Sequence, residues 1–428
     1  MSERVIKKKY FKITFDLVSP LALGSGDNDR TDKDMIKDTV GRPYIPASSV
    51  AGVVRDYLLS KDPNKAKKYL GDVVTATTDN HPSDHSDSCI IFYDAVINSE
   101  KWRISVRDSV ALDEYKTAKK GAKFDMEIQE PGVTFTTYIE QDYTTGRDED
   151  YGAEVVSAFL NSRPVFGGKG MRGYGHIENV QAYEKTFCFP EDTEKWLGFD
   201  LFNAADWGEC SIAAKNGDVK EIRLLLKLRG GISIRRYTTR VSSEGKTEPD
   251  MEQLTLTDDT PVIPGSSWAG AIRHRMSEFG INTDKKGSIF GYVEGEGKDA
   301  KARSKITFGE SQIKGGSFKT LSRNAIDRFT GGTVDGALFT EKAYYGGTTD
   351  LIIGWRAKEP MSEKECRALA AALTDLHYGL LAVGGETSIG RGLFTIESIN
   401  GQDVPGDTAD NSEVIYNTIF SKIEEAFK

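Results

Sequence analysis

The stretch IPASSVAG at residues 45–52 returns later in the chain as IPGSSWAG at residues 263–270. An arginine follows each copy at the same spacing, Arg55 after the first and Arg273 after the second. The two copies lie about 217 residues apart, which is the length of a whole domain, whereas the units of solenoid proteins span roughly 20–50 residues. The pair therefore predicts two copies of one fold.

Two more pairs of motifs follow the same order in both halves. GGKGMRGYG at residues 167–175 returns as GGETSIGRG at residues 384–392. Between these motifs, ALDEY leading to GAKF at residues 111–124 returns as AIDRF leading to GALF at residues 325–339. Three motifs in one order make chance a poor explanation, so each functional element is expected twice.

The composition is that of a globular chain with two domains. The chain has 428 residues, a net charge of −9 and a pI near 5.4. This acidic balance disfavours a free nucleic-acid binder, because phosphate contacts need Lys and Arg, although local basic strips remain compatible with it. Four scattered cysteines, an N-terminus without a signal-peptide pattern and the lack of a long apolar run predict a cytoplasmic protein with no membrane contact.

The spacing of apolar residues predicts an α+β fold of the ferredoxin-like (RRM-like) kind in each half. The expected strands are residues 12–17, 176–178, 222–228 and 393–396, and the expected helices are residues 50–59, 153–160, 268–279, 363–381 and 411–428. Ser48 or Ser49, and Ser266 or Ser267, are the expected N-caps of the two helices that follow the repeat. We expect a first domain at residues 1–200, a second at 216–400 and a C-terminal segment at 401–428.

The last predicted helix carries a single apolar stripe. Its members are Ile415, Ile419, Ile423 and Phe427. A stripe at this spacing packs against a neighbour, and we expect that neighbour to be the helix's own domain, with a partner protein as the alternative.

The two glycine clusters suit contacts with a polyanion. Glycines let the backbone N–H groups of a loop approach phosphates closely, and Lys169, Arg172 and Arg391 add cations. Neither cluster is a P-loop, because no Gly-Lys-Ser/Thr ends it, and neither is a dinucleotide-binding fingerprint, because each follows a helix and precedes a strand. A tight turn that simply needs glycine is the alternative, but two clusters at matched positions favour polyanion binding.

Asp32 and Asp250 are the candidate catalytic residues. Each lies 11 residues before a proline of the repeat, Pro43 or Pro261, in a polar loop after the first strand of its half. A carboxylate in such a loop can hold a metal ion or take part in proton transfer at a 2′-hydroxyl. A solvated loop aspartate is the alternative. The neighbouring carboxylates that compete for the role are Asp34, Asp38, Glu252, Asp258 and Asp259.

A weak zinc candidate is formed by His81, His85 and Cys89, which are spaced by fours and which Cys188 or a carboxylate would complete. No CxxC pair supports such a site. With five histidines in the chain, a histidine-based acid–base catalyst has few candidates.

The chain resembles the RAMP superfamily, specifically the backbone subunits of type III CRISPR effector complexes. The most specific stretch is DKDMIKD at residues 32–38, running on to GRPYIPASS at residues 41–49. In the family this loop carries the aspartate that cleaves target RNA, and the resemblance assigns that role to Asp32. Ala47 stands where the family usually has glycine, which Gly265 restores in the second half. Asp250 matches the pattern by distance alone.

The resemblance also implies two RNA-contacting elements in each half. Two stretches resemble the family's thumb hairpin, which wedges between guide and target and displaces a base pair. Their candidate residues are Arg107, Asp113, Phe124, Arg323, Asp327 and Phe339. The glycine clusters resemble the family's G-loops, which contact the guide backbone. The RNA-binding candidates are Ser48, Ser49, Arg55, Gly167, Gly168, Lys169, Gly170, Arg172, Ser266, Ser267, Arg273, Gly384, Gly385 and Arg391.

A tandem copy resembles the fused backbone subunits of type III-D-like systems. The resemblance implies that the chain binds guide RNA and cleaves complementary target RNA by attack of a 2′-hydroxyl on the adjacent phosphate. The implied cofactor is Mg²⁺ or another divalent ion, with Asp32 as a possible ligand. The implied partners are guide CRISPR RNA, target RNA, other RAMP subunits, a small subunit and a large polymerase-like subunit. A non-catalytic RNA scaffold and a guide-processing ribonuclease are the alternatives.

Overall fold

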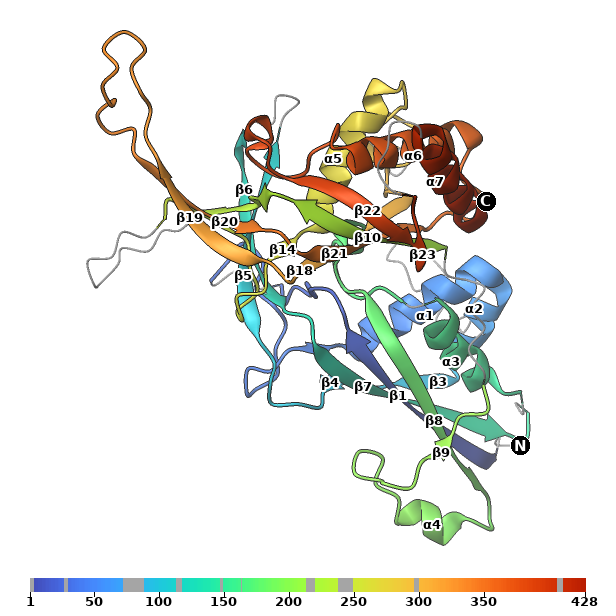
Figure 1. The fold of residues 1–428 in the computed structure, drawn as a ribbon. Coiled ribbons are helices and arrows are strands. Elements are labelled where there is room, and N and C mark those ends of the chain that lie inside the picture. The colour runs from blue at the N-terminus through green and yellow to red at the C-terminus, as the bar shows by residue number, and fades with distance from the viewer. Residues whose placement is uncertain are drawn as a thin grey trace. The chain divides into compact units, whose positions relative to one another are not determined.

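The computed structural model describes residues 4–26, 30–71, 88–112, 118–146, 149–162, 164–212, 220–237, 249–295, 300–405 and 411–428. Its contacts divide the chain into two compact units. The first unit holds Met1–Gly170 and Tyr174–Val219, and the second holds Met171–Gly173 and Lys220–Lys428. Figure 1 traces the chain through both units.

The first unit is built on one antiparallel sheet. Its strands are, in spatial order, β2 (Tyr44–Ile45), β4 (Ala95–Ile97), β7 (Val133–Thr144), β1 (Val5–Leu17), β8 (Ile177–Cys188) and β9 (Gly208–Glu209), and β3 (Ile90–Phe92) also pairs with β7. The central strand β1 pairs along nearly its whole length with β7 on one side and β8 on the other. The chain therefore brings residues about 130 and 170 positions apart into register along one strand.

Helices cover one face of this sheet, as Figure 1 shows. They are α1 (Ala47–Lys61), α2 (Pro63–Leu70) and α3 (Tyr151–Ser162). Because side chains alternate along a strand, Phe11, Ile13 and Phe15 of β1 all point into the core beneath the helices. Phe15 stacks on Phe135 and Phe166 with ring centroids 5.7 and 5.3 Å apart. Replacing one such ring by alanine costs about 3–5 kcal/mol.

The opposite face of the same sheet is partly covered by aromatic residues. Tyr10 of β1 points to this face, and it is nearly buried. Trp196 of the short helix α4 (Thr193–Leu197) donates its indole N–H to the Tyr10 hydroxyl at 2.9 Å, and Phe187 and Phe199 pack beside it. This contact satisfies the buried tyrosine oxygen while its ring stays in an apolar setting.

The second unit repeats the sheet strand for strand. Its order is β14 (Val262–Ile263), β18 (Ser311–Lys314), β21 (Thr348–Trp355), β10 (Glu221–Arg229), β22 (Leu393–Ile399) and β23 (Gln402–Asp403), and β17 (Ile306–Phe308) also pairs with β21. Here β10 takes the place of β1, β21 that of β7, and β22 that of β8. A separate short pair is formed by β15 (Tyr292–Val293) and β16 (Lys301–Ala302). The two antiparallel sheets with helices on one face agree with the predicted α+β class.

Three helices lie together in the second unit (Figure 1). They are α5 (Gly265–Glu278), α6 (Glu363–Tyr378) and α7 (Ser412–Phe427). The apolar stripe of α7 is buried within this unit, where α7 packs on α6, so the expectation that it packs on its own domain is confirmed. Within the described part of the chain, no helix is long and apolar enough to cross a membrane.

Each unit also carries a two-stranded hairpin, which lies along the chain between α2 and α3 in the first unit and between α5 and α6 in the second. In the first unit it is β5 (Ile104–Leu112) and β6 (Ala118–Gln129), and in the second it is β19 (Ser317–Arg323) and β20 (Phe339–Tyr345). The strand β20 is joined further by β11 (Gly231–Ile232) and by β13 (Met251–Gln253), which itself pairs with β12 (Arg235–Tyr237). Figure 1 shows β19 and β20 running out from the rest of their unit into a long loop.

The predicted helix N-caps are wrong. The helices α1 and α5 begin at Ala47 and Gly265, and their N-caps are Pro46 and Pro264. The serines that follow therefore lie in the first helical turn. The proline ring already holds φ near −58° and −59°, which suits the residue before a helix, and Asp94 instead accepts the Ala47 N–H at 2.6 Å.

Several predicted boundaries also move. The helix expected to reach residue 381 ends at Tyr378, because Gly379 takes a left-handed conformation at φ 76° and closes it. The strand expected at 176–178 is the start of the long β8, since its pairing with β1 continues to Cys188. The helices expected at 50–59 and 153–160 are each longer at both ends. Tertiary pairing, which periodicity does not reveal, extends these elements.

Candidate nucleic-acid interface

The loop aspartate of the first unit is fixed to strand β6 of the hairpin. The Asp32 N–H donates to Oδ1 of Asp125 on β6 at 2.8 Å, and the Asp125 N–H donates to Oδ2 of Asp32 at 3.0 Å. Asp32 is exposed and Asp125 is half-buried. The two hydrogen bonds hold two carboxylates side by side at the edge of the hairpin.

The loop aspartate of the second unit is also held by two hydrogen bonds, to the corresponding strand. The Asp250 N–H donates to the Thr340 carbonyl oxygen at 2.8 Å, and the Thr340 N–H donates to Oδ2 of Asp250 at 2.8 Å. Thr340 follows Phe339 on β20 just as Asp125 follows Phe124 on β6. Asp32 and Asp250 therefore take corresponding places in their units, and both are exposed.

The competing carboxylates of the first loop are occupied in its turns. Asp34, which is buried, accepts the N–H groups of Arg30 and Thr31 at 3.1 and 2.9 Å. Asp38 accepts the backbone N–H and the Nε of Arg42 at 2.8 and 3.0 Å. Although desolvation opposes the shift, these bonds hold the pKa of Asp38 below its ordinary value. Both side chains shape the loop.

The competing carboxylates of the second half lie in a strand and a turn. Glu252 lies in β13, paired with Arg236 of β12. Asp258 accepts the Thr260 N–H at 3.1 Å, and Asp259 takes a left-handed conformation with φ 62°. Of the five competing carboxylates, none makes the pair of bonds to the hairpin that marks Asp32 and Asp250 in the described residues.

The two glycine loops have the same backbone conformation. Gly175 and Gly392 have φ of 71° and 72°, and a Cβ on either would lie 1.8 or 1.9 Å from a carbonyl oxygen, that of Phe166 or Val383. The N–H of each of these partner residues donates back across the loop at 2.9 Å. Only glycine permits both the conformation and the close approach. The alternative interpretation, a turn that needs glycine, is thus correct at these two positions.

Some of the backbone N–H groups expected to bind a polyanion already donate hydrogen bonds to other parts of the same unit. The Gly168 N–H donates to the Ala22 carbonyl at 2.8 Å, and the Gly385 N–H donates to the Ser233 carbonyl at 2.8 Å. These two N–H groups tie the loops to the segments that follow β1 and β11. The short 3-10 turns that follow, Gly170–Arg172 and Thr387–Ile389, complete the loops.

One position of the shared loop carries opposite charges. Lys169 and Glu386 correspond, and both are left-handed, with φ of 61° and 55°. Lys169 Nζ lies 3.9 Å from the centre of the Phe124 ring and 3.1 Å from Met126 Sδ, both on β6. Glu386 instead pairs with Arg323 of β19 at 3.3 Å. In each loop this side chain therefore contacts the hairpin of its own unit.

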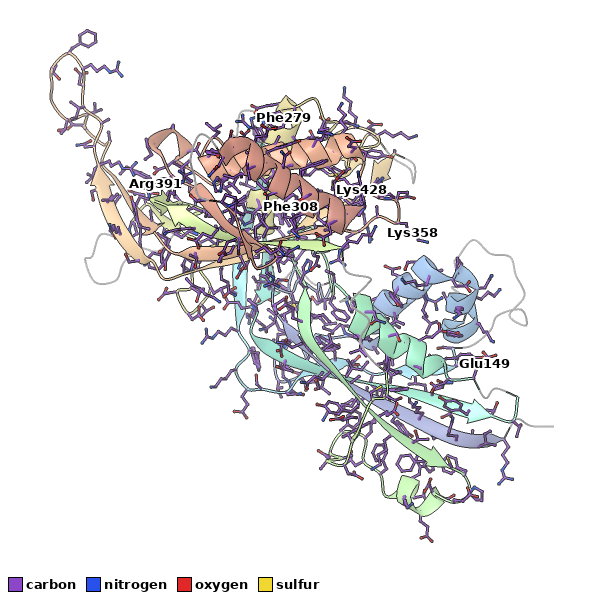
Figure 2. The ribbon with its side chains drawn as sticks, turned by 45° about the vertical axis from the view of Figure 1, so that its right-hand side comes forward. Glu149, Phe279, Phe308, Lys358, Arg391 and Lys428 are labelled. Atoms are coloured by element: carbon purple, nitrogen blue, oxygen red, sulfur yellow. The ribbon has the colours of Figure 1, made fainter. Side chains whose placement is uncertain are left out.

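The second loop is the centre of an ion-pair network. Arg391 is buried, and it pairs with Glu341 of β20 at 2.6 Å and with Glu386 at 2.9 Å. Arg323 also reaches Glu341, at 3.1 Å, and Arg235 lies 3.9 Å from Glu386. Although desolvation opposes the shift, a hydrogen bond to Glu341 and the charges of the arginines lower the pKa of Glu386. Figure 2 labels Arg391 at the base of the hairpin.

A comparison with protein families identifies the family to which the chain belongs. The model of the RAMP superfamily matches residues 14–178 and residues 217–395. The chain belongs to the RAMP superfamily. Each matched region holds one loop aspartate, one hairpin and one glycine loop, so the two regions indicate tandem RAMP domains. No curated protein matches the chain. Membership in the superfamily implies an RNA-binding subunit of a CRISPR effector.

The RNA-binding candidates of the two RAMP units differ in availability. Arg55 donates to the carbonyl oxygens of Leu70 and Gly71 at 2.6 and 3.0 Å, so it closes the end of α2. Arg391 is neutralised in the buried network. Arg172 and Arg273 are exposed. Ser48, Ser266, Gly167 and Gly384 are exposed, and Ser49, Ser267 and Gly170 are half-buried.

The thumb candidates of the RAMP units have structural partners. Arg107 is buried in β5, opposite Met126. The Asp327 carboxylate accepts the N–H groups of Thr330 and Phe329 at 2.8 and 2.9 Å, which lower its pKa. Phe124 and Phe339 are half-buried where the loop aspartates attach. Asp113 lies outside the described residues. The second hairpin exposes an apolar tip, made up of Ile326, Phe329 and Leu338.

The first site has the ligand types that suit magnesium. No group of three or more His, Cys, Asp and Glu that could hold a metal ion occurs in the described ranges. Mg²⁺ is commonly bound by one or two carboxylates together with water and substrate phosphates, and the exposed Asp32 is a carboxylate of that kind. Of the zinc candidates, His81 and His85 lie outside the described residues, and the Cys89 sulfur lies 3.7 Å from the Lys68 carbonyl.

Two of these residues were missed by sequence reasoning. Asp125 follows the GAKF motif directly, and Glu341 lies two residues after the matching GALF motif. The repeat could have drawn attention to both, because aligning the motifs sets Asp125 against Thr340 and Met126 against Glu341. Residues that differ between otherwise matched copies mark places where the two units make different contacts.

Proposed function

We propose that this chain is a guide-RNA-binding backbone subunit of a type III CRISPR effector complex, of the tandem III-D-like kind, that also cleaves complementary target RNA. The observation that carries the proposal is the duplicated attachment of an exposed loop aspartate to a strand of a hairpin, at Asp32 and at Asp250. A repeating unit suits a repeating polymer, and one chain would supply two consecutive positions along the guide.

The chain would grip RNA through its backbone and not through its base sequence. Amides and cations contact phosphates without reading the bases, and pairing between guide and target supplies specificity. The exposed cations Arg172 and Arg273 and the exposed serines Ser48 and Ser266 are the candidates for those contacts. An acidic net charge is compatible with a local groove of this kind. The proposed partners are guide and target RNA, other RAMP subunits, a small subunit and a large polymerase-like subunit.

The proposed cleavage is an internal transfer within the target strand. The 2′-hydroxyl oxygen attacks the adjacent phosphorus, the bond from phosphorus to the 5′ oxygen breaks, and the 5′ oxygen takes up a proton. The products are a 2′,3′-cyclic phosphate and a 5′-hydroxyl. Asp32 would orient the 2′-hydroxyl or accept its proton. A divalent ion held by Asp32 would supply positive charge against the phosphate.

The test is target cleavage by the guide-loaded complex with Mg²⁺, comparing wild type with Asp32→Ala and Asp250→Ala. We expect each variant to lose one distinct cut, with its rate lowered by at least about a hundredfold. Asp56→Ala is a matched control, because Asp56 is an exposed aspartate of α1 outside both loops.

The same assay separates the alternatives. Loss of a cut with Asp32→Ala alone would make the second unit a scaffold. Unchanged products from both variants, with guide binding intact, would contradict cleavage by this chain and leave a non-catalytic scaffold. Cyclic-phosphate ends on the cut fragments are expected, and 3′-hydroxyl ends would rule out the proposed attack.

A further inference from the structure

The two loop aspartates are held by different parts of the partner strand. In the second unit both partner atoms belong to the backbone of Thr340, whose carbonyl accepts the Asp250 N–H at 2.8 Å. In the first unit the Asp32 N–H is accepted by the side chain of Asp125, at 2.8 Å. Replacing Thr340 keeps both bonds in principle, whereas replacing Asp125 removes one.

The residues after each aspartate show the same contrast. In the second unit the segment that follows Asp250 is the strand β13, in which Met251 and Glu252 pair in register with β20. In the first unit the corresponding segment is held by Glu127 of β6, whose carboxylate accepts the Met35 N–H at 3.0 Å and pairs with Lys37 at 2.6 Å. Carboxylates of β6 thus help to hold this segment against the hairpin in the first unit, whereas strand pairing with β20 holds it in the second.

Asp125 is the carboxylate that acts on Asp32 itself. Glu127 is buried and anchors the loop beyond Asp32, with its own N–H bonded to the Lys33 carbonyl at 3.0 Å. Asp125 is half-buried and makes a closed pair of bonds with Asp32. A hydrogen bond to a charged acceptor is among the stronger kinds. The Asp125 N–H holds the Asp32 carboxylate, and the Asp125 carboxylate holds the Asp32 backbone from which that side chain extends.

We propose that Asp125 is a positioning residue of the first site alone, which holds Asp32 in its working orientation by accepting the Asp32 N–H. This inference rests on the proposed cleavage at Asp32. Among the described residues of the second unit, the backbone of Thr340 holds Asp250 in this way. Of these two attachments, the first depends on a replaceable side chain and the second on the backbone.

Cleavage by the guide-loaded complex tests the role. A reacting group displaced by about 1 Å can lose on the order of a hundredfold in rate, so Asp125→Ala should lower the first cut by about that factor and leave the second cut at the wild-type rate. Asp125→Asn keeps the Oδ1 acceptor without its charge, so it should restore most of the first cut. The second cut within the same molecules is the internal control.

The outcomes separate three explanations. If Asp125→Ala leaves the first cut unchanged while Asp32→Ala removes it, Asp125 has no positioning role. If Asp125→Asn is as inactive as Asp125→Ala, the charge of Asp125 is what counts, as for a metal ligand, and the assignment as a positioning residue is overturned. If Asp32→Ala also leaves every product unchanged, the proposed cleavage itself has failed.

Hydrogen exchange of the full-length chain tests the same role without cleavage. Peptides spanning residues 30–38 should exchange faster in Asp125→Ala than in wild type, and Asp125→Asn should match wild type. Peptides spanning residues 250–256 should be unaffected by these changes, and also by Thr340→Ala, since that change keeps both backbone bonds. Equal exchange of residues 30–38 in wild type and Asp125→Ala would overturn the proposal whatever the cleavage assay gives.

Discussion

The two glycine loops have the same backbone and opposite chemistry. Glycines at matched positions have nearly equal φ, and the loop closes on itself through the same hydrogen bond in both units. Yet the left-handed residue between them is Lys169 in one loop and Glu386 in the other. The comparison teaches that the glycines set where this side chain lies, while its chemistry sets which hairpin residues it contacts.

The neighbours have changed together with that residue. Lys169 faces the Phe124 ring and Met126, an apolar setting completed by Tyr174. At the positions that match Met126 and Tyr174, the second unit has Glu341 and Arg391, which pair with each other at 2.6 Å. A single substitution therefore cannot convert one loop into the other, since a charge moved alone would be buried without its partner.

The largest expected loss of stability comes from replacing the glycines that set the common backbone conformation of the two loops. Gly175→Ala and Gly392→Ala should each destabilise their own unit by about 3–5 kcal/mol, because strain at positive φ adds to a clash with a carbonyl oxygen. Chemical denaturation of the full chain measures this. Gly168→Ala is the control, since its Cβ would lie 3.6 Å from the nearest atom, and it should cost less than about 1 kcal/mol. A small effect at Gly175 or Gly392 would contradict the shared rigid backbone.

The next largest effect is a pH-dependent loss of stability that only the second loop should show. Glu386→Gln should destabilise the second unit by about 2 kcal/mol near neutral pH, because it removes a charge that faces Arg323 and Arg391. The pKa of Glu386 is lowered in the folded chain, so its contribution is complete above the ordinary pKa of a glutamate and is lost as the pH falls through the lowered value.

Denaturation of both proteins between about pH 7 and pH 3 checks the direction. The difference in the free energy of unfolding between wild type and Glu386→Gln should be constant near pH 7 and should shrink as the pH falls. Glu425→Gln, which breaks an exposed pair with Lys422, should change stability by no more than about 0.5 kcal/mol at any pH. A difference that grows towards acid would contradict the lowered pKa.

Much of the fold could be predicted from the repeat, because motif order survives where single residues do not. The halves, the α+β class and the last helix follow from spacing and periodicity. Counting back from the prolines selects Asp250, and the structure places its carboxylate on the Thr340 N–H as it places Asp32 on that of Asp125. The catalytic role of both aspartates stays a prediction.

What sequence reasoning missed depends on partners far along the chain. Arg55 and Arg391 look like phosphate ligands by residue type, but their hydrogen bonds and ion pairs lie within the fold. The serines at the helix starts look like caps, yet a preceding proline takes that position. Asp125 lies 93 residues from Asp32, and no local pattern relates the two. Residue type suggests a chemistry, and only the fold shows whether it is already used.

The smallest expected effect concerns the cation that only the first loop carries. Lys169→Ala should cost the first unit about 0.5–1 kcal/mol through the lost contact with the Phe124 ring. If Lys169 also contacts the guide backbone as proposed, the salt dependence of guide binding should fall by about one phosphate contact. Filter binding of guide RNA at several salt concentrations measures this, with Lys358→Ala, an exposed lysine of the second unit, as the control. An unchanged salt slope would leave Lys169 as a support of the hairpin only, and the two loops would then differ in how they attach to their hairpins but not in how they meet RNA.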